Sequence, residues 1–314
     1  MATTKILVTG ATGKTGAPVV KLLAERGYAV RAMVHRLDER SRELEDLGTE
    51  VVVGDFRDLA SVREAMKGVH RVYFCYPPYD GLLRATVNVA VAARDAGVEA
   101  LVNMSQLPAR EKARSPLSHD HWLSEQILDW ADIGASHIRP TFFSEDLYLF
   151  TAGSIGRDGK IFLPFGNGKH APVSADDIAR VVVGILADPK PHVGQRYVLT
   201  GPRDMSLPEI ADSIGATIGR SVEYVDIPVE AWQSALVEQP EFPDYLAHHL
   251  AAVAQDHQDG VFSAETDVVR DIGGQAPQSV EEFVRENQEL FGVQPAANQD
   301  ETLLATHGTT GDEK

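Results

Sequence analysis

The residues with the most specific chemistry are three glycines near the N-terminus, spaced Gly10-x-x-Gly13-x-x-Gly16. They follow the strand-like run Lys5–Thr9 and open the amphipathic segment Thr15–Arg26. In that context the first glycine permits a tight turn, the second lets the backbone approach a pyrophosphate, and the third lets the helix pack closely on the strand. The start of the helix also offers free N–H groups and a positive dipole to phosphates. We therefore predict a dinucleotide site made by Gly10, Thr12, Gly13, Lys14, Thr15 and Gly16.

A competing motif overlaps this turn, because Gly13-Lys14-Thr15 resembles the end of a P-loop. That motif needs an earlier glycine where this chain has Val8, and the loop here is too short to wrap a β-phosphate. We interpret Lys14 instead as a side chain beside the cofactor phosphates. The alternative is an exposed residue in the first turn of a helix.

The choice of dinucleotide depends on the end of the second predicted strand, which reads Met33-Val-His-Arg36. NAD(H)-binding proteins place a carboxylate near this point to bind the ribose hydroxyls, and this chain has none before Asp38. Arg36 can pair with a 2′-phosphate, and His35 can stack or donate a hydrogen bond beside it. NADP(H) is therefore predicted over NAD(H); the alternative is a solvated basic turn.

The turn lies within a chain of alternating short strands and amphipathic helices. The predicted strands are Lys5–Thr9, Ala29–Val34, Val51–Val53, Arg71–Cys75, Ala100–Met104 and Ala135–Ile138. The predicted helices between them are Thr15–Arg26, Glu39–Leu47, Leu59–Lys67, Leu82–Ala96 and Leu117–Asp132. Strand–helix–strand units with such short turns predict an α/β fold, a doubly wound parallel Rossmann sheet covered on both faces.

The pattern loosens after Pro140, which suggests a division into two lobes. Residues 1–140 are expected to form the dinucleotide-binding domain, and 141–293 a smaller, mainly helical substrate lobe. Within the latter, residues from about 173 to 200 contain a helix and a strand that we expect to complete the first sheet. Two capping boxes, Ser206 with Glu209 and Ser279 with Glu282, open further helices. Residues 294–314 lack a core-forming pattern and are predicted to be a disordered tail.

Four segments together resemble the NmrA-like branch of the atypical short-chain dehydrogenases. They are Val8–Gly16, Gly54-Asp55, Pro77–Asp80 and Ile138–Asp146, the last similar to the branch's L-R-P-x-x-F-x-E-N element. The branch contains NADPH-dependent quinone and triphenylmethane-dye reductases, and also regulators that bind the cofactor without turnover. The resemblance implies that Asp55 contacts the adenine, although Asp55 could instead cap the following turn. We also assign Phe56, Tyr76 and Pro77 to the cofactor site.

The resemblance also indicates that this chain lacks the family's usual catalytic acid. Short-chain dehydrogenases protonate a carbonyl with the tyrosine of Y-x-x-x-K. Aligning Glu125 with the family's helix glutamate puts His121 at the lysine position and Leu117 at the tyrosine position. The quinone and dye reductases of the branch share the histidine, and their electron-poor acceptors take hydride before a proton arrives.

Two residues remain as candidates for the reacting centre. Ser105 stands where the family has its substrate-polarising Ser or Thr, or else it caps a loop. His121 could bond the nicotinamide ribose or relay a proton, or it could be a plain helix-face residue. A metal is not expected, because His119 and His121 point in different directions on a helix and no third ligand is evident. The pair His248-His249 is interpreted as surface.

The acceptor is expected to be a small aromatic or quinone molecule, with Tyr79, Phe142 and Phe143 as pocket wall. The net charge of −17 argues against a nucleic-acid partner, and no apolar run is long enough for a membrane span or a signal peptide. The single cysteine, Cys75, fits a reducing cytoplasm.

The leading prediction is an NADPH-dependent reductase that delivers hydride to a quinone-like or conjugated aromatic compound, for example in natural-product metabolism. The alternative is an NADP(H)-sensing regulator without turnover. Neither the substrate's identity nor the oligomeric state follows from the sequence.

Overall fold

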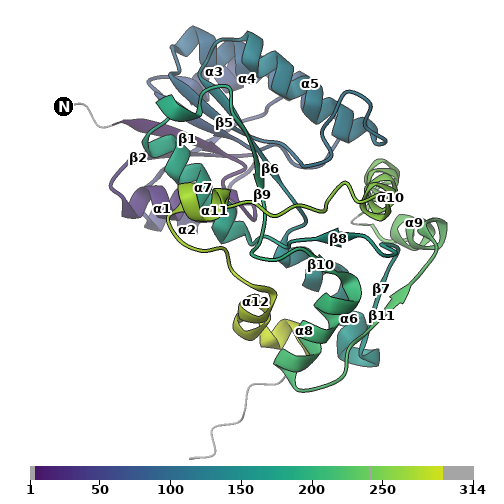
Figure 1. Cartoon of the computed structure of the whole chain (residues 1–314). Coiled ribbons are helices and arrows are strands. Elements are labelled where there is room, and N and C mark those ends of the chain that lie inside the picture. Colours follow the sequence, from purple (N-terminus) through teal and green to yellow (C-terminus); the bar gives the residue numbers. More distant parts are fainter. Residues whose placement is uncertain (1–3, 241, 293–314) are drawn as a thin grey trace, which may run out of the picture.

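A computed structural model describes residues 4–240 and 242–292 of the 314-residue chain. Its centre is a seven-stranded parallel sheet with the order β3-β2-β1-β4-β5-β6-β9 (Figure 1). The strands are β1 (Lys5–Thr9), β2 (Ala29–Val34), β3 (Glu50–Val53), β4 (Arg71–Phe74), β5 (Ala100–Met104), β6 (Ala135–Pro140) and β9 (Arg196–Leu199). The predicted doubly wound fold is confirmed. The strand order reverses between β1 and β4, and in such sheets ligands bind at the carboxyl ends of the strands at this switch point.

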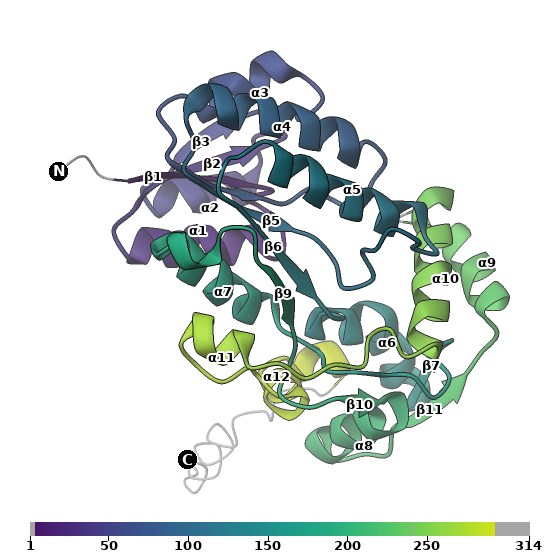
Figure 2. The same ribbon diagram turned by 45° about the horizontal axis from the view of Figure 1, so that its top comes forward.

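Helices cover both faces of the sheet (Figures 1 and 2). One face carries α1 (Gly16–Glu25), α2 (Glu39–Asp46), α7 (Ala175–Ala187) and α11 (Val268–Gly273), and the other carries α3 (Leu59–Met66), α4 (Leu82–Ala96) and α5 (Pro116–Trp130). Successive side chains of a strand point to opposite faces, so each strand contributes to both cores. In β1, Ile6 and Val8 pack on the first face and Leu7 on the second. This explains why the strands have almost continuous hydrophobic sequences.

A second core lies beyond the carboxyl ends of the strands, in the lower part of Figure 2. Its helices are α6 (Ser144–Asp158), α8 (Leu207–Ile218), α9 (Val229–Val237), α10 (Asp244–Gln258) and α12 (Val280–Glu286). Two small sheets complete it, pairing β8 (Lys169–His170) with β10 (Met205–Ser206) and β7 (Lys160–Leu163) with β11 (Glu223–Asp226). Two short 3-10 turns, Lys190–His192 and Gln288–Phe291, follow α7 and α12. Both predicted capping boxes form, at the starts of α8 and α12.

Several elements were not predicted. The segment that forms α6 contains Gly153 and Gly156, which weaken its helical propensity, and β8 and β10 have only two residues each. The six-residue α11 is held by tertiary contact, because a Cβ on Gly184 of α7 would lie 2.4 Å from the carbonyl oxygen of Ile272. Only a glycine in α7 allows this approach. The predicted tail, residues 294–314, lies outside the described residues.

Candidate functional site

The glycine-rich turn joins β1 to α1 with the geometry expected of a phosphate-binding turn. Gly10 has φ +58°, and a Cβ on Gly16 would lie only 2.1 Å from the carbonyl oxygen of Gly10. A Cβ on Gly13 would meet only that same oxygen, at 3.1 Å, which leaves its other side open to a ligand. The first turn of α1 is Gly16-Ala-Pro18, so no acidic side chain opposes an anion there. The backbone of this turn can therefore receive a pyrophosphate.

Two side chains of the turn have partners that limit what they can do. The hydroxyl of Thr15 is buried and lies 2.9 Å from the hydroxyl of Tyr73, so Thr15 can serve a phosphate only through its backbone N–H. Lys14 Nζ lies 3.4 Å from Asp146 Oδ1, in the first turn of α6. Lys14 is therefore an ion-pair link between the glycine turn and the second lobe. Thr12 is half-buried beside it.

A basic group follows the carboxyl end of β2. Arg36 is 78% exposed, and its Nε lies 4.0 Å from Asp38 Oδ2, while Arg40 Nη2 lies 2.6 Å from the same oxygen. The hydrogen bond from Arg40 lowers the pKa of Asp38, whose other oxygen caps α2. His35 is exposed next to Arg36. Arg40, which sequence reasoning did not single out, adds a second guanidinium to this basic group.

The loops after β3 and β4 pack against each other beside this group. Asp55 Oδ1 accepts a hydrogen bond of 2.8 Å from the N–H of Arg57, which is the turn-capping contact considered as its alternative role. The Phe56 ring meets Tyr76 edge to face at 5.6 Å between centroids, and the Tyr76 hydroxyl donates to the carbonyl of Asp80. Pro77 follows, exposed. The side chain of Asp55 remains 44% exposed and available to a ligand.

The end of β5 carries a buried polar network. Ser105 Oγ donates a hydrogen bond of 2.6 Å to Glu125 Oε1, and Glu125 is fully buried. Arg139 donates to both carboxylate oxygens, through Nε at 2.8 Å and Nη2 at 2.5 Å. Arg196 Nε adds a bond of 2.9 Å. Burial acts to raise the pKa of Glu125, but the hydrogen bonds from Arg139 and Ser105 outweigh it and lower the pKa, so the carboxylate is ionised.

His121 faces the same region from α5 and is only 9% exposed. Its Nδ1 is buried and has no hydrogen-bond partner within residues 4–240 and 242–292. Burial, with a smaller effect of His249, lowers the pKa of His121 to about 3. The imidazole is therefore neutral near pH 7, and Leu117, one turn before it, is buried among apolar side chains.

The surface interpretation of the His248-His249 pair is wrong for His249. His248 is exposed, but His249 is 8% exposed, and its Nδ1 lies 2.7 Å from the Oγ of Ser115, the N-cap of α5. Burial lowers the pKa of His249 to about 4. The helix α10 lies beside the N-terminal end of α5 (Figure 2), and its amphipathic pattern alone does not reveal which neighbour it covers.

The three aromatic residues expected to line the acceptor pocket lie in different surroundings. Tyr79 is 51% exposed, and Phe143 packs partly buried against the first core. Phe142 packs with a buried aromatic cluster, at 4.7 Å from Phe262 and 4.9 Å from Phe165 between ring centroids. One face of Phe142 is thus used by the second core, and its contact with a substrate stays a prediction.

An acidic and aromatic group brings together residues of α10, α5 and the loop after β4. Burial, together with the carboxylates of Asp120 and Asp80, raises the pKa of Tyr245 to about 12, and the ring of Tyr76 is also close. Tyr245 belongs to α10, Asp120 to α5, and the other two follow β4.

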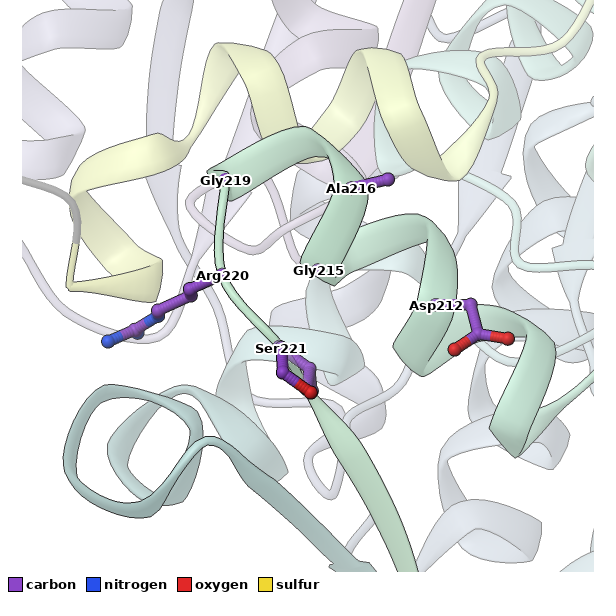
Figure 3. A pocket seen from close by; sticks show the side chains of 7 residues that line it. Asp212, Gly215, Ala216, Gly219, Arg220 and Ser221 are labelled. Atoms are coloured by element: carbon purple, nitrogen blue, oxygen red, sulfur yellow. The ribbon is translucent and has the colours of Figure 1, made fainter.

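Other parts of the molecule are weaker candidates for a functional site. A cavity of about 470 Å³ lies at the end of α8, away from the glycine turn, and is lined by Asp212, Gly215, Ala216, Gly219, Arg220, Ser221 and Val222. Figure 3 shows Asp212 and Arg220 pointing away from each other, so its charged groups do not converge on a ligand. Within the described ranges, no cluster of three or more His, Cys, Asp or Glu side chains could hold a metal ion. No helix there is long and apolar enough to span a bilayer.

Known proteins are similar to this chain in both sequence and fold. The model of the NmrA-like family matches residues 2–284. An NAD(P)H azoreductase from Xenophilus azovorans is 31% identical over 293 residues, which cover 92% of this chain and 99% of the relative. The NADPH complex of an NADPH-dependent quinone oxidoreductase from Escherichia coli superposes with a TM-score of 0.79 at 25% identity, covering 90% of this chain and 99% of that one. A triphenylmethane reductase from Citrobacter sp. has the same TM-score and identity, covering 91% and 99%.

Proposed function

The chain belongs to the NmrA-like family, and on that premise we propose that it is an NADPH-dependent oxidoreductase that transfers hydride to a quinone-like or conjugated aromatic molecule. The NAD(P)H azoreductase, the NADPH-dependent quinone oxidoreductase and the triphenylmethane reductase that it resembles support a reductase of small conjugated compounds. Residues 1–140 would hold the cofactor, and 141–293 would form most of the substrate lobe, with 173–200 returning to the sheet.

The observation that carries this proposal is that none of the three described residues at the predicted reacting centre, Leu117, His121 and Ser105, can act as a general acid near pH 7. Leu117 is 1% exposed in an apolar core, the neutral His121 is not an acid near pH 7, and Ser105 donates its proton to Glu125. An acceptor that needs protonation as hydride arrives is therefore disfavoured. Electron-poor conjugated acceptors take hydride without that assistance.

The described residues fit NADPH in the following way. The N–H groups of the Gly10–Gly16 turn would face the pyrophosphate, with Lys14 beside it. Arg36, supported by Arg40, would pair with the 2′-phosphate. Asp55 and Phe56 would lie at the adenine end, and Ser105 and His121 at the nicotinamide end. The bound cofactor would supply the hydride, and the protein would orient it.

Loss of NADPH absorbance with a panel of quinones, azo compounds and triphenylmethane dyes tests this function. Steady consumption that disappears in Gly13→Val, with its fold intact, supports an enzyme that uses the predicted turn. Tight NADPH binding with no oxidation by any acceptor would instead identify a cofactor-sensing regulator. Robust reduction of unconjugated ketones would overturn the proposed chemistry, because it requires an acid.

A further inference from the structure

An ion pair joins the glycine-rich turn to the second lobe. Lys14 Nζ, in the turn between β1 and α1, lies 3.4 Å from Asp146 Oδ1, in the first turn of α6. The side chain of Lys14 is 42% exposed and that of Asp146 is 26% exposed. The ammonium that the turn offers to a cofactor phosphate is therefore already paired with a carboxylate of the other lobe.

Asp146 is held in place more firmly than its partner. Asp146 Oδ2 accepts a hydrogen bond of 3.3 Å from the N–H of Phe143, and Phe143 also forms a parallel β-bridge with Val173. The neighbouring Glu145 ties the same helix start to α7, because its Oε1 accepts a hydrogen bond of 3.0 Å from the N–H of Ala175. The carboxylate therefore stays where it is when the ion pair opens, and the long, flexible lysine is the partner that moves.

A bound dinucleotide would bring a second anion to the same ammonium. The pyrophosphate carries two negative charges, and the three N–H donors of Lys14 attract it as a compact point charge. Turning toward the phosphates costs Lys14 its pair with Asp146, which offsets part of the attraction. The carboxylate is partly exposed, so water and salt screen its direct repulsion of the phosphates. Its effect on a bound cofactor therefore acts mainly through the lysine.

Resting on the proposed function, which puts the pyrophosphate on the Gly10–Gly16 turn, we propose that Asp146 regulates cofactor exchange by competing for Lys14. In the empty protein the ammonium rests on Asp146, and an arriving cofactor has to displace it. The competition weakens the binding of NADPH and NADP⁺ equally, and it speeds the departure of NADP⁺ after hydride transfer. Arg36 acts on the 2′-phosphate instead, so cofactor choice and cofactor exchange depend on different residues.

The test compares Asp146→Asn with Asp158→Asn by calorimetry and by stopped-flow displacement of bound cofactor. The asparagine oxygen can still accept from the N–H of Phe143, so the start of α6 keeps its cap. Asp158 ends the same helix and pairs with Arg157, so this control removes an equal charge about 18 Å away along the helix axis.

Asp146→Asn should tighten the binding of NADPH, NADP⁺ and NADH by the same factor, about threefold to fivefold, as expected for a partly exposed ion pair. The dissociation rate of NADP⁺ should fall by that factor, because affinity changes of this kind lie mainly in the dissociation rate. Asp158→Asn should change neither quantity. Adenosine 2′-monophosphate, which has the 2′-phosphate but no pyrophosphate, should bind the parent protein and Asp146→Asn equally.

Lys14→Met shows whether the lysine transmits the effect. In that background Asp146→Asn should change the NADPH affinity by less than about 1.5-fold, because no ammonium is left to compete for. An unchanged affinity in Asp146→Asn, an equal gain with and without Lys14, or an equal gain in Asp158→Asn would overturn the inference while leaving a cofactor-binding reductase in place. Failure of the parent protein to bind any of the dinucleotides would refute the proposed function and this inference with it.

Discussion

His249 Nδ1 lies 2.7 Å from Ser115 Oγ, and this contact joins α10 to the N-cap residue of α5. Farther along α10, the buried Asp256 receives two hydrogen bonds from Arg110, at 3.0 and 2.7 Å. The loop between β5 and α5 is thus held at its middle, Arg110, and at its end, Ser115, by one helix of the second lobe. Ser105 begins that loop and His121 follows it, so the second lobe helps to position both candidate residues of the reacting centre.

Cofactor selection can be tested at Arg36. NADPH should bind at least about tenfold more tightly than NADH, because a charge-assisted contact with the 2′-phosphate contributes on the order of 2 kcal/mol. Arg36→Ala should remove most of that difference, and Arg36→Ala combined with Arg40→Ala should remove the rest. Calorimetry measures both affinities, with the exposed Arg26→Ala as control. Equal affinities in the parent protein would contradict the assignment.

The pyrophosphate position can be tested at Gly13. A valine there places a branched side chain on the open side of the turn, so NADPH binding should collapse while circular dichroism stays native. Gly156→Ala is the matched control, since its Cβ would have nothing within 4 Å and its helix should be unaffected. Normal NADPH affinity in Gly13→Val would place the phosphates elsewhere.

A neutral His121 should contribute little to proton transfer. His121→Ala is expected to lower kcat for a quinone by less than about tenfold, whereas loss of a general acid costs about a hundredfold or more. The activity should also show no titration near pH 6.5, the ordinary pKa of histidine, because the pKa of His121 is about 3. His248→Ala, at an exposed position of α10, is the control for replacing a histidine with alanine. A bell-shaped profile centred near neutrality that is lost in His121→Ala would refute this.

Acid should destabilise the fold through its buried histidines. The pKa values of His121, His249 and His257 are lowered to about 3, 4 and 4, with burial the main cause. Below pH 6.5 the unfolded chain takes up protons that the folded chain does not, so the free energy of unfolding falls as the pH drops toward 4. Each group contributes up to about 1.4 kcal/mol per pH unit.

Urea unfolding at several pH values measures this slope. His249→Gln should flatten it, and His248→Gln should not. A slope that is identical in all three proteins would show that His249 is protonated without penalty in the native state.

The Glu125 network should also contribute to stability. Glu125→Gln leaves Arg139 and Arg196 without their shared counter-charge, at a cost on the order of 3 kcal/mol. Asp95→Asn breaks an ion pair with Arg63 in which both side chains are about half exposed, and it should cost less than about 1 kcal/mol. Thermal denaturation compares the two, and similar losses would mean that the buried carboxylate has no special role.

The local sequence determined the first domain almost residue by residue. The predicted Lys5–Thr9, Ala29–Val34, Ala100–Met104 and Leu82–Ala96 match β1, β2, β5 and α4 at both ends. Strand periodicity, helical periodicity and terminating glycines are local signals, and here they agree with the packing. The glycine turn could also be predicted from the sequence, because its residues lie within seven positions of one another.

Tertiary structure alone decided the environment of the candidate reacting centre. Ser105 and Glu125 are 20 residues apart, and Ser115 and His249 are 134 apart. Whether a serine donates or accepts, and whether a histidine is exposed or neutral and buried, depends on which distant groups surround it. Glu125 reaches Ser105 because α5 packs beside β6 and β9, and His249 reaches Ser115 because α10 docks on α5. The side-chain pattern of a helix tells which face is buried but not which partner buries it. The sequence therefore identified the candidate residues, whereas their hydrogen-bond partners and protonation states depend on the tertiary structure.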